Sequence, residues 1–195
     1  MDFQARRSAP APVSPAAFYR APNLRCGAVR IGSTPTATFA KDLRGVTEVR
    51  AGVFMFQDLV MVGLGVCEAS DVAMSVLTSV IGHQKERGFI ISDAGWMALS
   101  RDRGTASQVL DQGYGLVCNA AGEAQNDLIV SATNQEHGMI SSRSGQAIAW
   151  EKYPIGTLLR ILPNHACATS AMFERYFVVD GCAQIADVWP RINGW

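Results

Sequence analysis

A histidine and a cysteine stand two residues apart near the carboxyl end of the chain, at His165 and Cys167. They directly follow the apolar run 157–162, whose composition predicts a β-strand. If the strand continues through the pair, both side chains project from one face, because residues i and i+2 of a strand point the same way. Imidazole nitrogen and thiolate sulfur are common zinc ligands, and a site with few protein ligands keeps positions open for water or substrate. The pair therefore indicates a metal site, although a buried thiol beside a hydrogen-bonded histidine would give the same pattern.

A second group of candidate residues follows the first predicted strand. Gly32 is followed by Ser33 and Thr34, and a strand that ends in this way can present backbone N–H groups and hydroxyls to an anion such as phosphate. An ordinary Ser/Thr/Pro turn is the alternative. Farther along, Gly52 interrupts the β-rich segment 46–56. A glycine in a strand marks either a bulge or a place where another group comes close to the backbone.

Two further titratable residues, Glu136 and His137, lie in the polar segment 134–138 between two apolar stretches. A carboxylate beside an imidazole could carry out acid–base chemistry. The same residues could equally belong to a hydrogen-bonded turn.

Composition bounds the kind of protein this chain can be. Its 195 residues, 48% hydrophobic and 17% charged, are enough for a folded domain with a core. The formal net charge is zero and no basic stripe is visible, so we expect neither nucleic-acid nor membrane binding. No apolar run is long enough to span a bilayer, and the amino-terminal residues lack the pattern of a signal peptide. The five cysteines are widely scattered, which does not indicate a disulfide framework, so we expect a cytoplasmic protein.

The spacing of β-rich runs between Gly, Asp and Asn turns predicts a mainly antiparallel β domain with a few short helices. Four prolines in 8–22 predict an extended tail or linker over 1–24, which leaves 25–195 as the domain. We expect a short helix at 105–112 and place His83 in a solvated turn. Strands are predicted at 72–81, 88–93, 114–118, 128–132 and 157–162, with a hairpin over 175–188 that turns at Asp180-Gly181.

Taken in order, several of these segments resemble the carboxyl-terminal part of the D-serine dehydratase and D-threonine aldolase family, which is similar in architecture to alanine racemase. The segments are 32–36, 47–58, 93–95, 135–138 and 163–169. The resemblance runs from about residue 25 to the end of the chain. It implies a fold in which an amino-terminal (β/α)8 barrel binds pyridoxal 5′-phosphate and a carboxyl-terminal β domain completes the site. This chain would then contain the antiparallel β domain and the last strand or strands of an incomplete barrel.

The resemblance also implies site residues and a reaction. Backbone around Ser33–Thr34 and Gly52–Val53 would hold the cofactor's phosphate, and His165 and Cys167 would bind zinc. Cysteine at the second metal position favours the dehydratase branch, because aldolase-like members often have aspartate there. The implied reaction is a β-elimination from a D-3-hydroxy amino acid such as D-serine or D-threonine. The pyridoxal ring would act as the electron sink, and zinc would make the β-hydroxyl a better leaving group.

One departure from the family bears on activity. The lysine that carries the cofactor lies in the amino-terminal half of the family, and none of this chain's three lysines, Lys41, Lys85 and Lys152, matches it. The resemblance therefore implies a domain that is inactive alone. The alternative is a non-catalytic, metal-binding β module that self-associates or binds a partner chain. An unrelated Cys/His hydrolase is a third hypothesis, which lacks an evident orienting acid. An incomplete barrel would expose apolar strand edges, so we expect a homo-oligomer.

Overall fold

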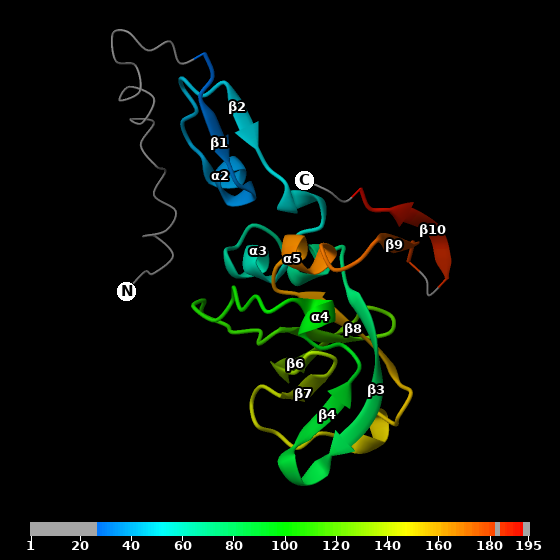
Figure 1. Ribbon diagram of the computed structural model, residues 1–195. Helices are drawn as coiled ribbons and strands as arrows, with labels where there is room; N and C mark the ends of the chain where they lie inside the picture. Colours follow the sequence, from blue (N-terminus) through cyan, green and yellow to red (C-terminus); the bar gives the residue numbers. More distant parts are fainter. Residues whose placement is uncertain (1–26, 182–183, 193–195) are drawn as a thin grey trace.

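The computed structural model describes residues 27–181 and 184–192. The proline-rich tail predicted for 1–24 lies outside the described residues. Figure 1 shows a small parallel unit at one end, a β-barrel at the other, and short helices and a hairpin around the junction between them.

The parallel unit comes first in the chain. Strands β1 (Arg30–Gly32) and β2 (Glu48–Arg50) pair in parallel, and helix α2 (Thr34–Phe39) connects them. Parallel neighbours need a crossover of this kind, because both strands run in the same direction. A strand, a helix and a parallel strand form the repeating unit of a (β/α)8 barrel. The segment therefore agrees with the expected last strands of an incomplete barrel.

Six antiparallel strands form a closed barrel in the order β3-β4-β7-β6-β5-β8. Closure leaves no open edge within this sheet, which removes the usual route to edge-to-edge association. The strands are β3 (Val76–Gln84), β4 (Phe89–Ser92), β5 (Gly115–Asn119), β6 (Ala124–Thr133), β7 (Gly138–Ser142) and β8 (Leu158–Pro163). The expectation of a mainly β, antiparallel domain with short helices is confirmed.

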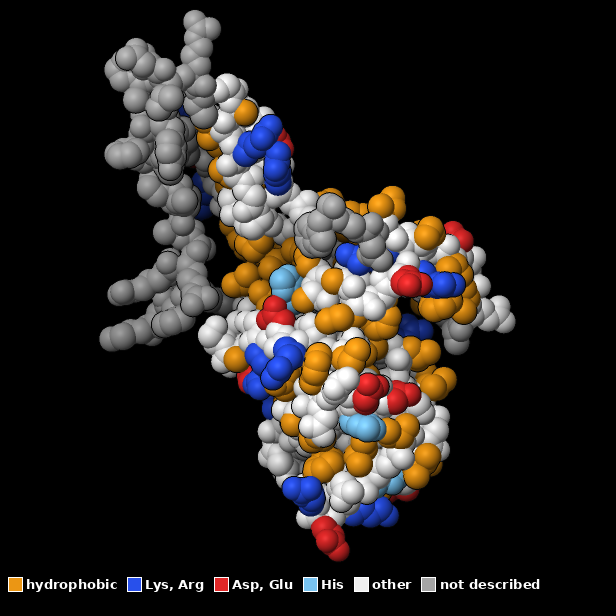
Figure 2. Space-filling view, in the orientation of Figure 1, with side chains coloured by type: hydrophobic (Ala, Val, Ile, Leu, Met, Phe, Trp, Pro, Cys, Tyr) orange, Lys and Arg blue, Asp and Glu red, His pale blue; other side chains and the backbone are white. Residues whose placement is uncertain are grey.

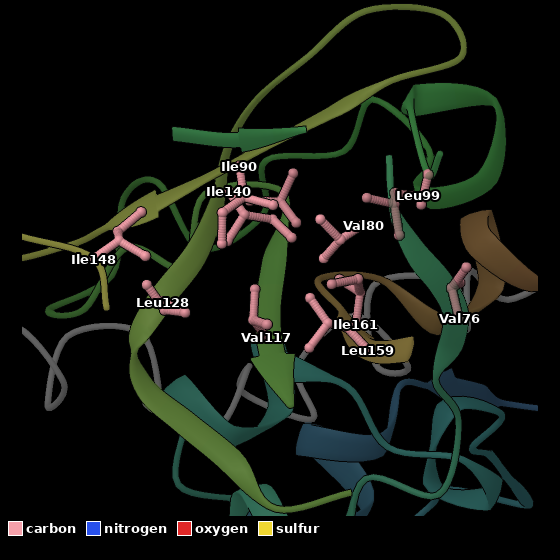
Figure 3. Close-up of a cluster of buried hydrophobic side chains, with 12 residues drawn as sticks. Val76, Val80, Ile90, Leu99, Val117, Leu128, Ile140, Ile148, Leu159 and Ile161 are labelled. Carbon is pink, nitrogen blue, oxygen red and sulfur yellow. The ribbon is translucent and has the colours of Figure 1, made fainter. Parts of the chain in front are cut away.

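The barrel interior contains the main hydrophobic core (Figure 3), to which strands such as β6 and β8 contribute every second residue. On β3, for example, Val76 and Val80 are 7% and 0% exposed, whereas Leu77 between them is 63% exposed. Val117 of β5 and Ile161 of β8 are both fully buried in the same cluster. This alternation is what a strand with one face toward a core requires.

A second apolar cluster lies on the outer face of the barrel and joins it to the rest of the chain. Leu116 and Cys118 of β5 and Leu162 of β8 are next to inward-facing residues in sequence, and so they point outward. They pack against Leu59 at the start of helix α3 (Leu59–Gly63). Because both of its faces are covered, β5 is buried along almost its whole length.

Two more short helices lie beside α3 at this end of the barrel (Figure 1). Helix α4 (Trp96–Leu99) follows β4, and helix α5 (Ala166–Ser170) follows β8. The Thr169 hydroxyl donates to the Leu99 carbonyl at 3.0 Å and ties the two helices together. The described 3-10 turns are η1 (Val53–Met55), η2 (Ala69–Asp71), η3 (Lys85–Arg87) and η4 (Trp150–Lys152).

The predicted carboxyl-terminal hairpin is present as a separate two-stranded sheet. Strands β9 (Arg175–Val179) and β10 (Ile185–Pro190) pair antiparallel. Large apolar side chains remain exposed on it, including Phe177 at 61% and Trp189 at 52%, and hydrophobic side chains reach the surface in this region (Figure 2). The ring of Tyr176 contacts that of Phe56, with centroids 5.2 Å apart, and so joins the hairpin to the junction.

Two local predictions are wrong. Residues 105–112 form turns and bends instead of a helix. The side chains of Thr105 and Asp111 accept hydrogen bonds from the backbone N–H groups of Gln112 and Gly113, which stabilises the loop conformation. His83 lies within β3, half-buried, with its Nε2 atom 2.6 Å from the Tyr153 carbonyl oxygen. Among the described residues, no helix is long and apolar enough to cross a membrane.

Candidate functional site

His165 and Cys167 do not share a strand face, so that part of the sequence interpretation is wrong. The apolar run does form a strand, but β8 ends at Pro163 and the chain then turns into α5. His165 is the N-cap residue of α5, with extended backbone, and Cys167 lies in its first turn. The turn nevertheless exposes both groups to solvent. The imidazole is 43% exposed and the Cys167 thiol belongs to an exposed residue outside any disulfide.

The imidazole of His165 is held by a carboxylate that the sequence analysis did not identify. Its Nδ1 atom lies 2.6 Å from Oδ2 of Asp102. An ionised carboxylate can only accept hydrogen bonds, so the ring carries its proton on Nδ1 and donates a hydrogen bond to Asp102. In the neutral ring this leaves the lone pair on Nε2, which is the atom able to bind a metal. Asp102 lies in the charged loop between α4 and β5, and nothing in that loop's local pattern distinguishes it from a solvated acid.

A buried aspartate fixes the turn that carries His165 and Cys167. Asp58 is 1% exposed and caps α3 by accepting from the Met61 N–H at 3.0 Å. Its second oxygen accepts from the N–H of Ala166, also at 3.0 Å, across 108 residues of sequence. The first residue of α5 is thereby joined to the start of α3, which follows the parallel unit directly.

The four residues expected to hold a phosphate lie at the carboxyl ends of the two parallel strands. Ser33 follows β1, and its N–H donates to the Arg50 carbonyl of β2 at 2.9 Å. Thr34 is buried, and its Oγ1 accepts from the N–H of Phe54 at 3.1 Å. These two bonds bring Ser33 and Thr34 together with Gly52–Val53, whose residues begin the η1 turn.

The groups left over at these strand ends are suited to an anion. Within the described part of the chain, the backbone N–H groups of Thr34, Gly52 and Val53 donate no hydrogen bond. A Cβ atom added at Gly52 would meet nothing within 4 Å, so the space beside this backbone is open. Ser33 is already engaged, because its N–H donates to the Arg50 carbonyl and its hydroxyl donates to Thr36 Oγ1 at 2.8 Å. Its hydroxyl would have to turn away from Thr36 to donate to an anion.

The donor set at the α5 turn suits a soft or borderline divalent ion with few protein ligands. It consists of Nε2 of His165, which has no hydrogen-bond partner among the described residues, and the sulfur of the exposed Cys167. These are ligand types that zinc prefers. No cluster of three or more His, Cys, Asp or Glu side chains that could hold a metal occurs among residues 27–181 and 184–192. Any ion here would therefore keep open positions, as catalytic zinc does.

Glu136 and His137 lie apart from this arrangement of groups. They are exposed at the turn between β6 and β7. The backbone of this turn is engaged, because the Asn134 carbonyl accepts from the N–H of Trp96 at 3.0 Å and the Gln135 carbonyl from that of Met97 at 3.2 Å. The geometry is that of a hydrogen-bonded turn, the alternative that the sequence left open.

Comparisons with known proteins bear on the whole chain. Residues 73–179 match the family model described as "Putative serine dehydratase domain". The D-threo-3-hydroxyaspartate dehydratase of Delftia sp. (strain HT23) is 53% identical over 187 residues, which cover 94% of this chain and 48% of that enzyme. The chain thus spans about half the length of this curated relative.

Two solved structures of variants of a D-threo-3-hydroxyaspartate dehydratase are also similar. One has a histidine replaced by alanine, and it matches at 52% identity with a TM-score of 0.84, over 92% of this chain and 46% of that one. The other has a cysteine replaced by alanine and is in the metal-free form; it matches at 50% identity with a TM-score of 0.83, over 98% of this chain and 51% of that one. The two replaced positions are two residues apart, as His165 and Cys167 are. On the match of the family model and the similarity along nearly its whole length, this chain belongs to the serine dehydratase domain family.

Proposed function

We propose that this chain is the carboxyl-terminal part of a zinc- and pyridoxal 5′-phosphate-dependent dehydratase that acts on D-3-hydroxy amino acids. Membership of the serine dehydratase domain family and the similarity to a D-threo-3-hydroxyaspartate dehydratase support the reaction class. Because the chain spans about half of that relative, activity requires the polypeptide that supplies the rest of the barrel and the lysine that carries the cofactor.

The observation that carries this proposal is the arrangement of His165. Its ring donates through Nδ1 to Asp102, its side chain is 43% exposed, and it stands two residues before the exposed Cys167. The structure of a cysteine variant in metal-free form, with the same two-residue spacing to a separately replaced histidine, supports reading this pair as metal ligands. Zinc held there would act as a Lewis acid on the β-hydroxyl of the substrate.

The parallel unit would supply the phosphate subsite of the cofactor. The N–H groups of Thr34, Gly52 and Val53, which are unpaired among the described residues, follow the carboxyl ends of β1 and β2, where barrels of this type commonly bind phosphate. The exposed hydroxyl of Ser33 lies beside them. The bound cofactor would serve as the electron sink for the substrate carbanion, and these residues of the chain would orient it.

Metal analysis of the full chain tests the zinc assignment. We expect the wild-type protein to retain about one zinc per chain and the His165→Ala, Cys167→Ala double variant to lose it. A matched control replaces another exposed histidine and another free cysteine, as in a His137→Ala, Cys67→Ala double variant, and should retain the metal. Equal zinc in all three proteins would contradict the assignment. Pyridoxal phosphate added to the chain alone should give no saturable change in absorbance, because the matching lysine is absent.

We also propose that the chain associates with itself or with the missing half of the barrel. Among the described residues, the β1–β2 sheet has two strands, and no third strand pairs with either outer edge. The β9–β10 hairpin exposes Phe177, Ile185 and Trp189 by more than half. Light scattering at several concentrations should give a mass above that of one chain, and a single-chain mass at all concentrations would count against self-association.

A second function is favoured by the closed barrel. Its six strands enclose their own core without help from β1 and β2, so the domain can serve as a metal-binding β module that is not catalytic. The two functions differ in one experiment: mixing the chain with an amino-terminal half from a related dehydratase should produce activity on D-3-hydroxy amino acids only if the first proposal holds.

The proposed compartment is the cytoplasm. Cys67, Cys118 and Cys167 are all outside disulfides, and such thiols persist in a reducing environment. A thiol ligand such as Cys167 would also need to stay reduced to bind zinc.

A further inference from the structure

Among the described residues, Asp102 is the side chain that bonds the imidazole of His165, and it comes from a loop 63 residues earlier in the chain. We infer that Asp102 is a positioning residue: it fixes the tautomer and the direction of the His165 ring so that Nε2 is ready to bind the metal. This inference rests on the proposed function, because it concerns how the proposed ligand is prepared. It assigns to the loop between α4 and β5 a role at the site.

The chemistry of the contact supports this role. A ring nitrogen that donates to a carboxylate at 2.6 Å carries the proton, which leaves the other nitrogen as the acceptor of a metal. Metal-bound histidines commonly donate their second N–H to a carboxylate or carbonyl, and loss of that partner weakens metal binding. His165 and Asp102 have side chains 43% and 34% exposed. Without the carboxylate, the imidazole would be free to rotate in solvent.

Asp102 is itself held in place by buried groups. Asn164 is 1% exposed, and its amide donates to the carbonyl of Asp102 at 3.2 Å and to that of Gly113 at 2.6 Å. The amide oxygen of Asn164 accepts from the hydroxyl of Thr105, which is fully buried, at 3.1 Å. The N–H of Asp102 donates to Ser100 Oγ at 3.2 Å. The backbone on which the carboxylate is mounted is thus fixed on both sides.

The same segment of chain fixes both partners. Asn164 immediately precedes His165, so the residue that holds the Asp102 backbone is joined covalently to the ring that Asp102 holds. The β8–α5 turn thus contacts the backbone of Asp102 through Asn164 and its carboxylate through His165.

Neighbouring charges leave the Asp102 carboxylate available to His165. Arg103 is paired with Asp111, with Nη2 2.5 Å from Oδ2, and its guanidinium lies over the ring of Tyr114. Arg101 lies over the ring of Trp96, 5.4 Å from its centroid. Both flanking arginines therefore have partners of their own.

Zinc titration of the full chain tests the inference. Asp102→Asn should weaken zinc binding by about 10- to 100-fold, the range found when such a partner of a metal-bound histidine is removed. Asp111→Asn is the matched control, since it makes the same substitution in the same loop and removes the same charge, but Asp111 does not contact His165. It should change the affinity by less than about threefold. If Asp102→Asn does not fold, as judged by its thermal unfolding, Asp102→Ala takes its place.

A spectroscopic readout separates positioning from general loosening of the loop. Nitrogen-15 NMR of the metal-free protein, at a pH where imidazoles are neutral, should find the proton of His165 on Nδ1. Asp102→Asn should abolish that preference and Asp111→Asn should keep it. The chain has three histidines, so comparison with His165→Ala assigns the signals.

The outcomes are distinct. Weaker zinc binding and a changed tautomer in Asp102→Asn alone support the inference. Equal losses of affinity in the two aspartate variants, or an unchanged tautomer, would overturn it while the metal site stands. If His165→Ala binds zinc as tightly as wild type, the metal assignment itself fails and the inference fails with it.

Discussion

Replacing Asp58 by alanine should destabilise the protein more than any ordinary helix-cap substitution. The carboxylate is 1% exposed and accepts two backbone hydrogen bonds, both of 3.0 Å, from Met61 and Ala166. The first caps α3 and the second holds the first residue of α5. Alanine removes both acceptors and leaves two N–H groups without partners, one of them far away in sequence.

The size of the effect follows from those two bonds. A hydrogen bond to an ionised group contributes about 1.5–3 kcal/mol, so the pair contributes about 3–6 kcal/mol. Removing the carboxylate also removes the cost of keeping it out of water, which moves the net loss toward the lower end. We therefore expect Asp58→Ala to lower the free energy of unfolding by about 3 kcal/mol. For a domain of this size that corresponds to a fall in Tm of about 6–12 °C.

Thermal and urea unfolding followed by circular dichroism will measure the loss, and two other variants will apportion it. Asparagine is as good an N-cap as aspartate, so Asp58→Asn should keep the bond from Met61. Its NH2 group can only donate, so the bond from Ala166 is lost, for about half the loss seen with alanine. Asp71→Ala is the matched control: Asp71 also accepts a backbone bond, at 2.8 Å from Glu68, but it is exposed. That variant should cost less than about 1 kcal/mol. If Asp58→Ala lowers the free energy of unfolding no more than Asp71→Ala does, the buried hydrogen bonds of Asp58 to α3 and α5 do not stabilise the protein as expected.

Two further predictions concern the barrel. Gly113 and Gly122 both have positive φ, but a Cβ at Gly113 would lie 2.3 Å from the Val130 carbonyl oxygen, whereas one at Gly122 would meet nothing closer than 3.8 Å. In urea unfolding, Gly113→Ala should therefore lower the free energy of unfolding by about 2 kcal/mol more than Gly122→Ala does. Equal losses of stability would contradict the clash. Burial raises the pKa of the Cys118 thiol to about 11, so in the folded, metal-free protein at pH 8 Cys118→Ser should leave the number of thiols that react quickly with iodoacetamide unchanged. Cys167 is exposed, so Cys167→Ser should reduce that number by one. A slower-reacting Cys167 and a fast Cys118 would reverse that expectation.

The strands were predictable because their signals are local. Alternating apolar residues and turn residues identify β3 and the β9–β10 hairpin without any knowledge of what they pair with. Closure of six strands into a barrel is a different matter, because it depends on the pairing of β3 with β8, which are more than 70 residues apart. No local pattern encodes that pairing. The same limit explains His83, whose half-burial in β3 depends on the distant Tyr153.

The candidate site was predictable only in its ligand types. The two-residue spacing of His165 and Cys167 identified the candidate metal ligands, but the geometry predicted for them was wrong. Both were expected on one face of a strand, whereas the strand ends at Pro163 and a helical turn begins. Asp102 and Asn164 gave no usable signal. An acid in a charged loop and an asparagine after a proline have unremarkable neighbours, and their roles arise from contacts with residues about 50 to 60 positions away.

Barrel pairing is what makes those distant contacts unavoidable. In the antiparallel register of β5 with β8, Gly115 lies opposite Pro163, so the loop that precedes β5 must run beside the turn that follows β8. A Cβ at Gly115 would lie 2.6 Å from the Leu162 carbonyl oxygen, and therefore only glycine lets the two strands approach so closely at this point. A shift of one residue in that register would turn the buried faces outward and move Asp102 along β8 away from His165. The geometry of the candidate metal site thus depends directly on how these two strands of the barrel are aligned.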